Sequence, residues 1–387
     1  MNPEIQGFCD PRFAAVKDVF RDNFLRHGDI GASFSVMLAG EPVVDLWAGH
    51  ADRQRTQPWQ RDTLVCVFSS TKIPTALCLH ILADEGKLDL NAPVADYWPE
   101  FAQQGKHQVR VRHLLSHSAG LPAFDGTMAT HHLYDWDRIT RQLAGQRPRW
   151  NAGSRTGYHA ITYGYLNGEI VRRITGLSIG QYFQQRVAEP LGIDFHYGVP
   201  ASQRVRMAEL SFPREYPFSR VPMPIVRGAS RVLGYLPQVF LNPIIRTCDT
   251  RSAEFLDAEI PGSNGHGNAR SLARIGAIFA GKGTLDGQQV LTEAAILRAT
   301  EPQSHGKDLV LNIPLSWGLG FALEKGAPHQ HHYPRLHWNG YGGSHIHADL
   351  EHQLSLGYAM NLGAVGVNTD ARAKRLKQAV YRSLGVS

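Results

Sequence analysis

A serine and a lysine three residues apart, Ser69 and Lys72, have the spacing of an activated nucleophile and its base. A serine hydroxyl is a weak nucleophile until a neighbouring base takes its proton. Residues three apart lie on the same face of a helix, so the Lys72 amine can reach the Ser69 hydroxyl. Burial and a nearby positive dipole lower the pKa of a lysine toward the range in which its amine acts as a base. If Ser69 opens the helix, its backbone N–H can also bind a substrate carbonyl oxygen, as half of an oxyanion hole.

The S-x-x-K pattern is weakly specific by itself, because only two of its four positions are fixed and chance matches are common. Taken alone, it favours an ordinary helix N-cap at Ser69 and a surface lysine at Lys72. Other segments must therefore decide whether the pair is functional.

A second serine, Ser178, is the central residue of a formal G-x-S-x-G motif over residues 176–180. A nucleophile elbow needs a strand before the serine and a helix after it. Here a helical pattern precedes the motif, and Gln181, three residues after the serine, completes a capping box. The sequence therefore predicts that Ser178 is the N-cap of a helix and that it has no catalytic role.

The periodicity of the apolar residues predicts the elements that position these side chains. Helices are expected where apolar residues recur every three to four positions, at 13–24, about 69–85, 161–174 and 271–281. A last helix is expected with Thr369 or Asp370 as its cap. Strands are expected where apolar residues alternate or flank a turn, at 32–38, 43–47, 317–323 and 354–360.

Strand signals lie at both ends of the chain and helical signals lie in the middle. We therefore expect an α+β fold in which residues 1–75 and 265–387 form an antiparallel sheet flanked by helices, and residues 76–264 form an inserted, mainly helical domain. Residues 200–261 hold eight prolines among many apolar residues, which excludes one long helix. This segment either wraps a pocket, as a lid does, or wraps the structure without a functional role.

The composition is that of an ordinary globular protein of 387 residues, with 43% hydrophobic and 19% charged residues and a formal net charge of +6. This excludes a disordered or fibrous chain. No dense run of basic residues indicates a nucleic-acid partner. The most basic stretch, 372–382, also carries apolar residues at helical spacing, so we interpret it as a helix with a solvated outer face.

No pattern in the chain indicates a cofactor or a metal. The G-x-G-x-x-G, Walker, H-E-x-x-H and C-x-x-C motifs are absent. No carboxylate pattern completes a ligand set with the clustered histidines, which are His329, His331, His332, His345 and His347. The four cysteines lack paired spacing, no signal-peptide pattern opens the chain and no apolar run is long enough for a membrane span, so we expect a cytoplasmic protein.

Three further segments give the Ser69 and Lys72 pair a context. The sequence RHLLSHSAGLP at 112–122 resembles the RHLLSHTSGLP segment of the serine β-lactamase-like superfamily. The sequence GYHAITYGY at 157–165 resembles its tyrosine motif, and WNGYGGS at 338–344 lies where that superfamily has K-T-G or H-x-G on a strand. The superfamily includes class C β-lactamases, penicillin-binding D-alanyl carboxypeptidases and family VIII carboxylesterases. The resemblance covers residues 30–365 in the same order.

This resemblance implies the two-domain β-lactamase/transpeptidase-like fold, with the active site between the domains. It implies that Ser69 is the acylated nucleophile and that Lys72 accepts or shuttles its proton. It implies that Tyr158 is the partner base and later activates the water that releases the acyl group. The backbone N–H groups of Ser69 and Tyr341 would hold the oxyanion.

The chain departs from the superfamily pattern at two positions, and both departures bear on the substrate. Trp338 stands where the K-T-G lysine binds a substrate carboxylate, so this position offers an apolar wall, as in the family VIII carboxylesterases. Ala160 replaces the asparagine of the tyrosine motif. We expect Trp338, Asn339 and Gly340 to contact the substrate, and His159 can line the pocket. Both changes indicate neutral, apolar esters.

The leading hypothesis is therefore a cofactor-independent serine carboxylesterase that hydrolyses short-chain esters through an acyl-Ser69 intermediate. Three alternatives use the same acyl-serine chemistry: a β-lactamase, a D-amino-acid peptidase or amidase, and an acyltransferase. A further alternative is a binding module that keeps the fold without catalysis.

Overall fold

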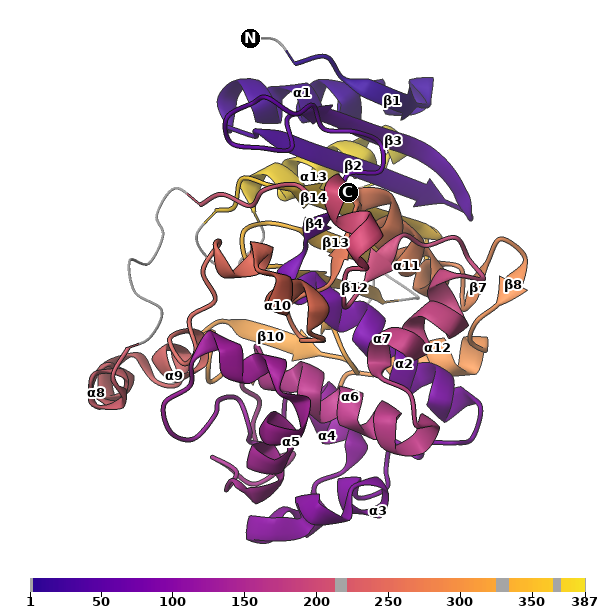
Figure 1. The fold of residues 1–387 in the computed structure, drawn as a ribbon. Helices are drawn as coiled ribbons and strands as arrows, with labels where there is room; N and C mark the ends of the chain where they lie inside the picture. The colour runs from indigo at the N-terminus through magenta and orange to yellow at the C-terminus, as the bar shows by residue number, and fades with distance from the viewer. Residues whose placement is uncertain (1–2, 213–220, 325–333, 365–369, 387) are drawn as a thin grey trace.

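The computed structural model describes residues 3–212, 221–324, 334–364 and 370–386. One antiparallel sheet of nine strands organises them (Figure 1). In spatial order its strands are β1 (Gln6–Cys9), β3 (Glu41–Gly49), β2 (Gly31–Leu38), β14 (Leu354–Met360), β13 (His345–Asp349), β12 (Arg335–Asn339), β11 (Ala322–Leu323), β10 (Pro314–Trp317) and β9 (Ser304–Lys307). The two ends of the chain therefore share one sheet, as the sequence predicts.

Helices cover both faces of the sheet. Helices α1 (Ala14–Arg26) and α13 (Ala371–Leu384) pack together on one face, and α11 (Ala269–Ala280) packs against β14, β2 and β13 on the other. Between the two sheet-forming parts lie α2 (Lys72–Asp84), α3 (Val94–Tyr97), α4 (Val111–Leu115), α5 (Trp136–Gly145), α6 (Thr162–Thr175), α7 (Ile179–Phe183), α8 (Met223–Leu233), α9 (Leu236–Phe240) and α10 (Ala253–Asp257). Helix α12 (Glu293–Thr300) follows α11, and the protein has an α+β fold.

Two small sheets complete the described structure. Strands β4 (Val65–Cys66), β6 (His266–Gly267) and β5 (Phe195–His196) form one, and β7 (Thr284–Leu285) and β8 (Gln288–Gln289) form the other. In the first of them β6, which follows the inserted segment directly, lies between β4, the strand before Ser69, and β5 from within the inserted segment.

The prediction of a single strand over 317–323 is wrong. These residues form the β10–β11 hairpin, in which Trp317 pairs with Ala322. The reversal lies between them, where the Gly318 N–H donates to the Phe321 carbonyl at 3.0 Å and Gly320 has a φ of +112°. Large apolar residues alternate with small residues along the sequence through the turn. The period of two is therefore the same as in a single strand, although the chain changes direction.

The buried apolar residues of the described structure form two main clusters. The smaller one lies between the sheet and the α1–α13 pair. The larger one runs without interruption from α11 and α12 through α2 into the inserted helices. The strands of the large sheet come from 6–49 and 304–360, but the inserted helices share this core, so the division at residues 75 and 265 remains a prediction.

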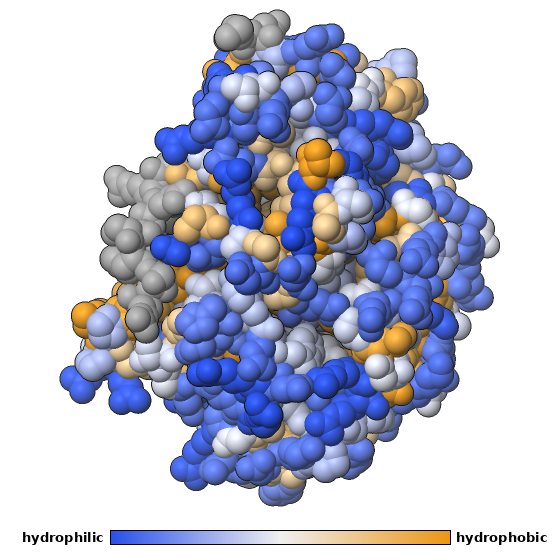
Figure 2. All heavy atoms as spheres, viewed as in Figure 1, coloured by the Kyte–Doolittle hydropathy of each residue, from blue (hydrophilic) through white to orange (hydrophobic). Residues whose placement is uncertain are grey.

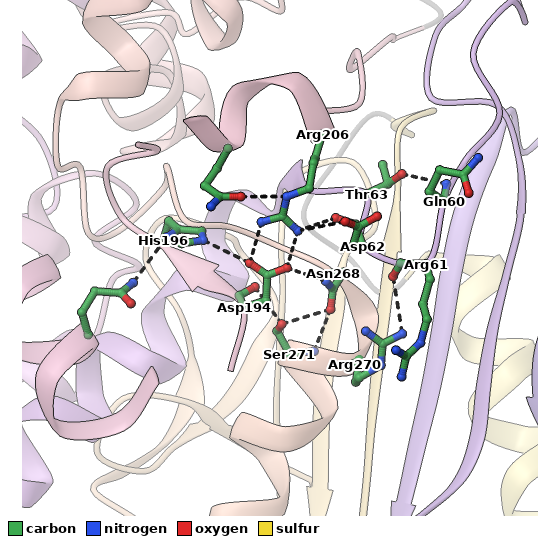
Figure 3. Close-up of polar contacts among 12 residues, drawn as sticks. Gln60, Arg61, Asp62, Thr63, Asp194, His196, Arg206, Asn268, Arg270 and Ser271 are labelled. Atoms are coloured by element: carbon green, nitrogen blue, oxygen red, sulfur yellow. Dashed lines mark hydrogen bonds and ion pairs between the residues drawn. The ribbon is translucent and has the colours of Figure 1, made fainter. Parts of the chain in front are cut away.

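A charged network ties the inserted segment to α11 (Figure 3). The Asp194 carboxylate accepts hydrogen bonds from both Arg206 terminal nitrogens, at 2.7 and 3.0 Å, and faces His196 Nε2 at 3.1 Å. The Ser271 hydroxyl of α11 donates to the Asp194 carbonyl at 2.7 Å. Burial raises the pKa of Asp194, but the bonds from His196 and Arg206 outweigh it and bring the pKa to about 2. The negative charge of Asp194 is therefore paired with the Arg206 guanidinium.

The surface seen in Figure 2 is mostly hydrophilic, with scattered hydrophobic side chains. Helix α8, which lies at the edge of the molecule in Figure 1, carries three exposed apolar residues, Ile225, Val232 and Leu233. Within the described ranges no helix is long and apolar enough to cross a membrane.

One feature of the basic C-terminal helix differs from the prediction. Asp370 caps α13 by accepting from the Arg372 N–H, as expected, whereas Thr369 lies outside the described residues. Arg372 itself is buried and pairs with Asp29 and Asp370, so the first turn of this helix is not a solvated face.

Candidate active site

Ser69 lies at the junction between a strand and a helix. Strand β4 leads to Val67, a 3₁₀ turn follows at Phe68–Thr71, and α2 continues from Lys72, so the predicted helix begins as a tighter turn. Phe68, the residue before the serine, has a φ of +42°, in the left-handed region that a residue with a Cβ rarely adopts. Backbone strain of this kind gathers at functional sites. Here it turns the chain sharply at the candidate nucleophile.

Lys72 is completely buried and its amine has three partners. The Nζ lies 3.2 Å from Ser69 Oγ and 2.7 Å from each of the carbonyl oxygens of Ala160 and Gly262. None of these three partners carries a formal charge.

This arrangement suits a neutral amine. Burial lowers the pKa of Lys72 well below its usual value. A neutral amine has two N–H groups for the two carbonyls, which only accept, and one lone pair, which then points at the Ser69 hydroxyl. Lys72 is therefore placed to take the proton of Ser69.

Tyr158 lies on the other side of the same hydroxyl. Its phenol oxygen is 2.6 Å from Ser69 Oγ, and the Trp338 indole N–H donates to it at 3.2 Å. The Lys72 amine lies 4.8 Å from the centre of the Tyr158 ring. Burial raises the pKa of Tyr158, and the bonds to Ser69 and Trp338 only partly oppose this, so the neutral phenol is the resting form. The structure thus brings Ser69, Lys72 and Tyr158 together.

The two carbonyls that hold Lys72 meet because glycines allow a close approach. Gly164, near the start of α6, packs directly against the backbone at Gly262, where a Cβ on either residue would overlap main-chain atoms. Ala160 supplies a backbone carbonyl, so the missing asparagine side chain does not affect the contact with Lys72.

The predicted oxyanion residue Tyr341 lies in a turn fastened to the nucleophile segment. The Ser344 hydroxyl donates to the Val67 carbonyl at 2.7 Å and lies 2.9 Å from Ser70 Oγ. The Tyr341 ring packs edge-on against Phe68, with centroids 6.0 Å apart. A side chain on Gly340 would overlap the Val67 carbonyl oxygen, so glycine permits this approach. The assignment of the Ser69 and Tyr341 N–H groups to the oxyanion remains a prediction.

The neighbouring residues Trp338 and Asn339 face opposite sides of β12, as consecutive residues of a strand do. Trp338 faces Tyr158, whereas the Asn339 side-chain oxygen bonds His345 on β13. Trp338 therefore forms a wall of the site, and the substrate contacts predicted for Asn339 and Gly340 remain predictions.

The sequence reasoning missed an acidic residue that holds Tyr158 in place. Asp308 is buried, and its Oδ1 accepts from the backbone N–H of Tyr158 at 3.0 Å. Its Oδ2 accepts from the Trp317 indole at 3.3 Å, and the Trp317 ring lies parallel to the Tyr158 ring. No motif surrounds Asp308, so only the fold reveals this contact.

The 200–261 segment contributes to the aromatic surroundings of the site. Phe240 of α9 stacks on Tyr158, with centroids 6.5 Å apart, and Phe212 packs against both Phe68 and Tyr341. The described part of this segment therefore packs beside the site, its role as a lid remains a prediction, and residues 213–220 lie outside the described residues.

Two histidines beside the site are structural. His159 accepts from the Leu121 N–H at 3.0 Å and bonds the Gly157 carbonyl through its other ring nitrogen. Burial lowers its pKa to about 3. His117 accepts from the His159 N–H at 3.1 Å and packs against Tyr158. Both imidazoles are neutral and fix the segment that carries Tyr158.

Ser178 is the N-cap of α7, as predicted. Its hydroxyl accepts from the Gln181 N–H, and the Gln181 side chain accepts from the Ser178 N–H, which completes the capping box. The same hydroxyl donates to Glu259 at 2.6 Å. These hydrogen bonds of Ser178 cap the helix and join it to Glu259.

The clustered histidines do not assemble a ligand set in the described chain, which contains no group of three or more histidine, cysteine or acidic residues around a common point. His347 bonds Tyr381 and His345 bonds Asn339. His329, His331 and His332 lie outside the described residues.

Comparisons with known proteins identify relatives of this chain. The family model described as Beta-lactamase matches residues 17–380. The Esterase/beta-lactamase LipL of Mycobacterium tuberculosis is 36% identical over 342 residues, which are 87% of this chain and 78% of that protein.

Two solved structures are similar over nearly the whole chain. A family VIII carboxylesterase is 38% identical with a TM-score of 0.90, covering 98% of this chain and 100% of its own. A penicillin-binding protein homologue from Caulobacter crescentus is 40% identical with a TM-score of 0.86 and the same coverage.

Proposed function

The chain belongs to the beta-lactamase family, and on that premise we propose that it is a serine carboxylesterase that acts through an acyl-Ser69 intermediate. One observation carries the proposal: Ser69 Oγ lies between the Lys72 amine at 3.2 Å and the Tyr158 phenol at 2.6 Å. The names of the relatives, a family VIII carboxylesterase and an esterase/beta-lactamase, support ester hydrolysis.

The reaction begins with a proton transfer inside this trio. Lys72 accepts the Ser69 proton as the oxygen attacks the ester carbonyl. The charge that develops on the carbonyl oxygen is stabilised by the backbone N–H groups of Ser69 and Tyr341. Because burial favours the neutral phenol, Tyr158 holds a proton for the leaving alkoxide. The Lys72 ammonium then returns a proton to the phenolate, which restores both groups.

Release of the acyl group reverses these roles. Water approaches from the side that the alcohol has left, where the Tyr158 phenol accepts its proton while passing its own proton to the neutral Lys72 amine. The Ser69 oxygen regains its proton as the carboxylic acid leaves. No cofactor takes part in the proposed cycle.

The walls of the site favour neutral esters with short acyl chains. Trp338 occupies the place of a carboxylate-binding lysine and directs its indole N–H to Tyr158 rather than to a ligand. Phe212 and Phe240 add apolar surface around the trio. Neutral acyl groups suit such a wall, whereas a substrate carboxylate would lose its water without gaining a cation from Trp338.

The test combines a p-nitrophenyl butyrate assay with intact-protein mass spectrometry. The wild-type enzyme should release nitrophenol and trap a Ser69 adduct with a p-nitrophenyl phosphonate, and Ser69→Ala should do neither. Ser178→Ala is the matched control, since it removes a helix cap, and should keep both. Activity that survives in Ser69→Ala, or loss confined to Ser178→Ala, would refute the assignment.

A chromogenic cephalosporin tests the β-lactamase alternative with the same preparations. We expect kcat/KM for it to be at least about 10³-fold lower than for the ester, because the carboxylate-binding lysine is replaced by Trp338. Comparable values for the two substrates would favour the β-lactamase.

A further inference from the structure

A polar pocket of about 500 Å³ lies outside the Ser69 trio. One wall consists of residues from 112–118 and 153–156, and the other of residues from 303–309, which include β9. The walls are joined where the Leu309 N–H donates to the Thr156 carbonyl at 2.9 Å. None of the proposed catalytic residues lines this pocket.

The lining carries positive charge without compensation. Arg112, Arg155 and Lys307 line it, and the lining residues include no aspartate or glutamate. Within the described ranges no carboxylate forms an ion pair with any of the three. Asp308 follows Lys307 directly, but its Oδ1 accepts from the Tyr158 N–H. Like charges held around one cavity repel each other, and a bound anion removes that repulsion.

Unused hydrogen-bond donors accompany these charges. Arg112 Nε and Ser304 Oγ are buried atoms without a hydrogen-bond partner in the described structure. His113 Nδ1 accepts from the Arg110 N–H at 3.1 Å, so the proton of the neutral ring is on Nε2. Burial, followed by the charges of Arg110 and Arg112, lowers the pKa of His113 to about 4, so the ring is neutral at pH 7. The neutral His113 ring therefore adds an N–H donor to the cations of the lining.

We propose that this pocket binds the phosphoryl group of a small organic phosphate, independently of ester hydrolysis. A single carboxylate would leave at least two of the three cations uncompensated, whereas a phosphate monoester carries close to two negative charges at pH 7. The Arg112 guanidinium supplies the fork that suits phosphate oxygens, and Lys307 supplies a point charge. A volume of about 500 Å³ exceeds a bare phosphate and leaves room for an attached organic group.

Isothermal titration calorimetry of the full chain tests this site without reference to activity. Four probes separate the possible ligands: glucose 6-phosphate, inorganic phosphate, succinate and glucose. We expect glucose 6-phosphate to bind one to one, more tightly than inorganic phosphate, with an affinity that falls as NaCl is added. Glucose should not bind. Succinate that binds as tightly as both phosphates, or no phosphate binding at millimolar concentration, would overturn the proposal.

Matched double variants locate the site. Arg155→Gln with Lys307→Gln removes two exposed cations from the rim and should weaken glucose 6-phosphate binding at least about tenfold. Lys374→Gln with Arg382→Gln makes the same charge change at exposed positions on α13, no residue of which lines the pocket, and should change the affinity less than about twofold. Equal losses in the two variants would show that net charge alone attracts the ligand. Thermal unfolding of both variants, with and without glucose 6-phosphate, confirms that they are folded.

Discussion

Two buried lysines in this protein, Lys72 and Lys106, have nearly the same surroundings. Each is completely buried, and each amine lies over an aromatic ring, at 4.8 Å from the ring centre of Tyr158 and 5.2 Å from that of Phe101. Each amine bonds backbone carbonyls and has no carboxylate among its hydrogen-bond partners in the described structure. The two sites differ in the third partner.

Lys106 binds three carbonyls, of Gln103, Ala144 and Gln146, at 2.6–2.9 Å. Carbonyl oxygens only accept, so three of them require the three N–H groups of an ammonium ion. Burial lowers the pKa of Lys106 to about 8, which leaves it charged at neutral pH. It joins the end of α5 to the segment before α4, where a cation also suits the helix C-terminus.

Lys72 has two carbonyls and the Ser69 hydroxyl, which can donate as well as accept. The exchange of one carbonyl for one hydroxyl is enough to make the neutral amine a good fit. Burial alone therefore does not make a lysine a base: the acceptors around it decide whether it can do without its proton. Four variants or measurements test this difference, in order of expected effect.

The largest effect is expected for Lys72→Met, which keeps the volume and removes the base. We expect kcat/KM for p-nitrophenyl butyrate to fall by about 10⁴-fold, because Ser69 loses its proton acceptor. Circular dichroism and thermal unfolding should show a folded protein. A loss below about tenfold would mean that another group accepts the proton.

Tyr158→Phe should have the next largest effect on rate. It removes the phenol proton for the leaving group but keeps the ring that stacks on Trp317. We expect kcat to fall by about 10²–10³-fold with a smaller change in KM. Retention of the wild-type rate would exclude Tyr158 from proton transfer and leave Lys72 to serve both steps.

Lys106→Met should lower stability and spare activity, whereas Lys72→Met should lower activity in a folded protein. It leaves three buried carbonyls without their donor, so we expect the free energy of unfolding in urea to fall by about 2–4 kcal/mol. The kcat/KM should stay within about twofold of wild type at a temperature where the variant is folded. A selective loss of activity would show that Lys106 contributes to the site and is not purely structural.

The smallest expected change is the dependence of kcat/KM on pH, counted for one pH unit. The proposed role requires a neutral Lys72 in the free enzyme, so kcat/KM should rise about tenfold per pH unit below the Lys72 pKa and be flat above it, and burial places this rise well below the range of an ordinary lysine. Raising the pH through that range removes the Lys72 proton and increases activity. The profile of Lys106→Met should coincide with wild type. A rise that continues above pH 9 would mean that the Lys72 pKa is not lowered.

Local features of the chain were predictable from the sequence, because they depend on residues close together along it. The spacing of Ser69 and Lys72 places both on one face, and Ser178 with Gln181 gives the capping box that the structure contains. The alternation at 354–360 gives β14. In contrast, the alternation at 317–323 could not distinguish a strand from a hairpin, since both preserve a period of two.

The sequence by itself thus determined that Ser69 and Lys72 lie together, the family motifs and the α+β architecture, while only the tertiary structure decided what surrounds the lysine. The carbonyls of Ala160 and Gly262 are 88 and 190 residues from Lys72, and Asp308 reaches Tyr158 across 150 residues. Every residue carries a carbonyl group, so a carbonyl partner leaves no trace in residue type. The chain encodes such partners only through the packing that brings them together, as where Gly164 meets Gly262. The buried Arg372 illustrates the same limit: its helix was predictable, but its pairing with Asp29, 343 residues away, required the fold.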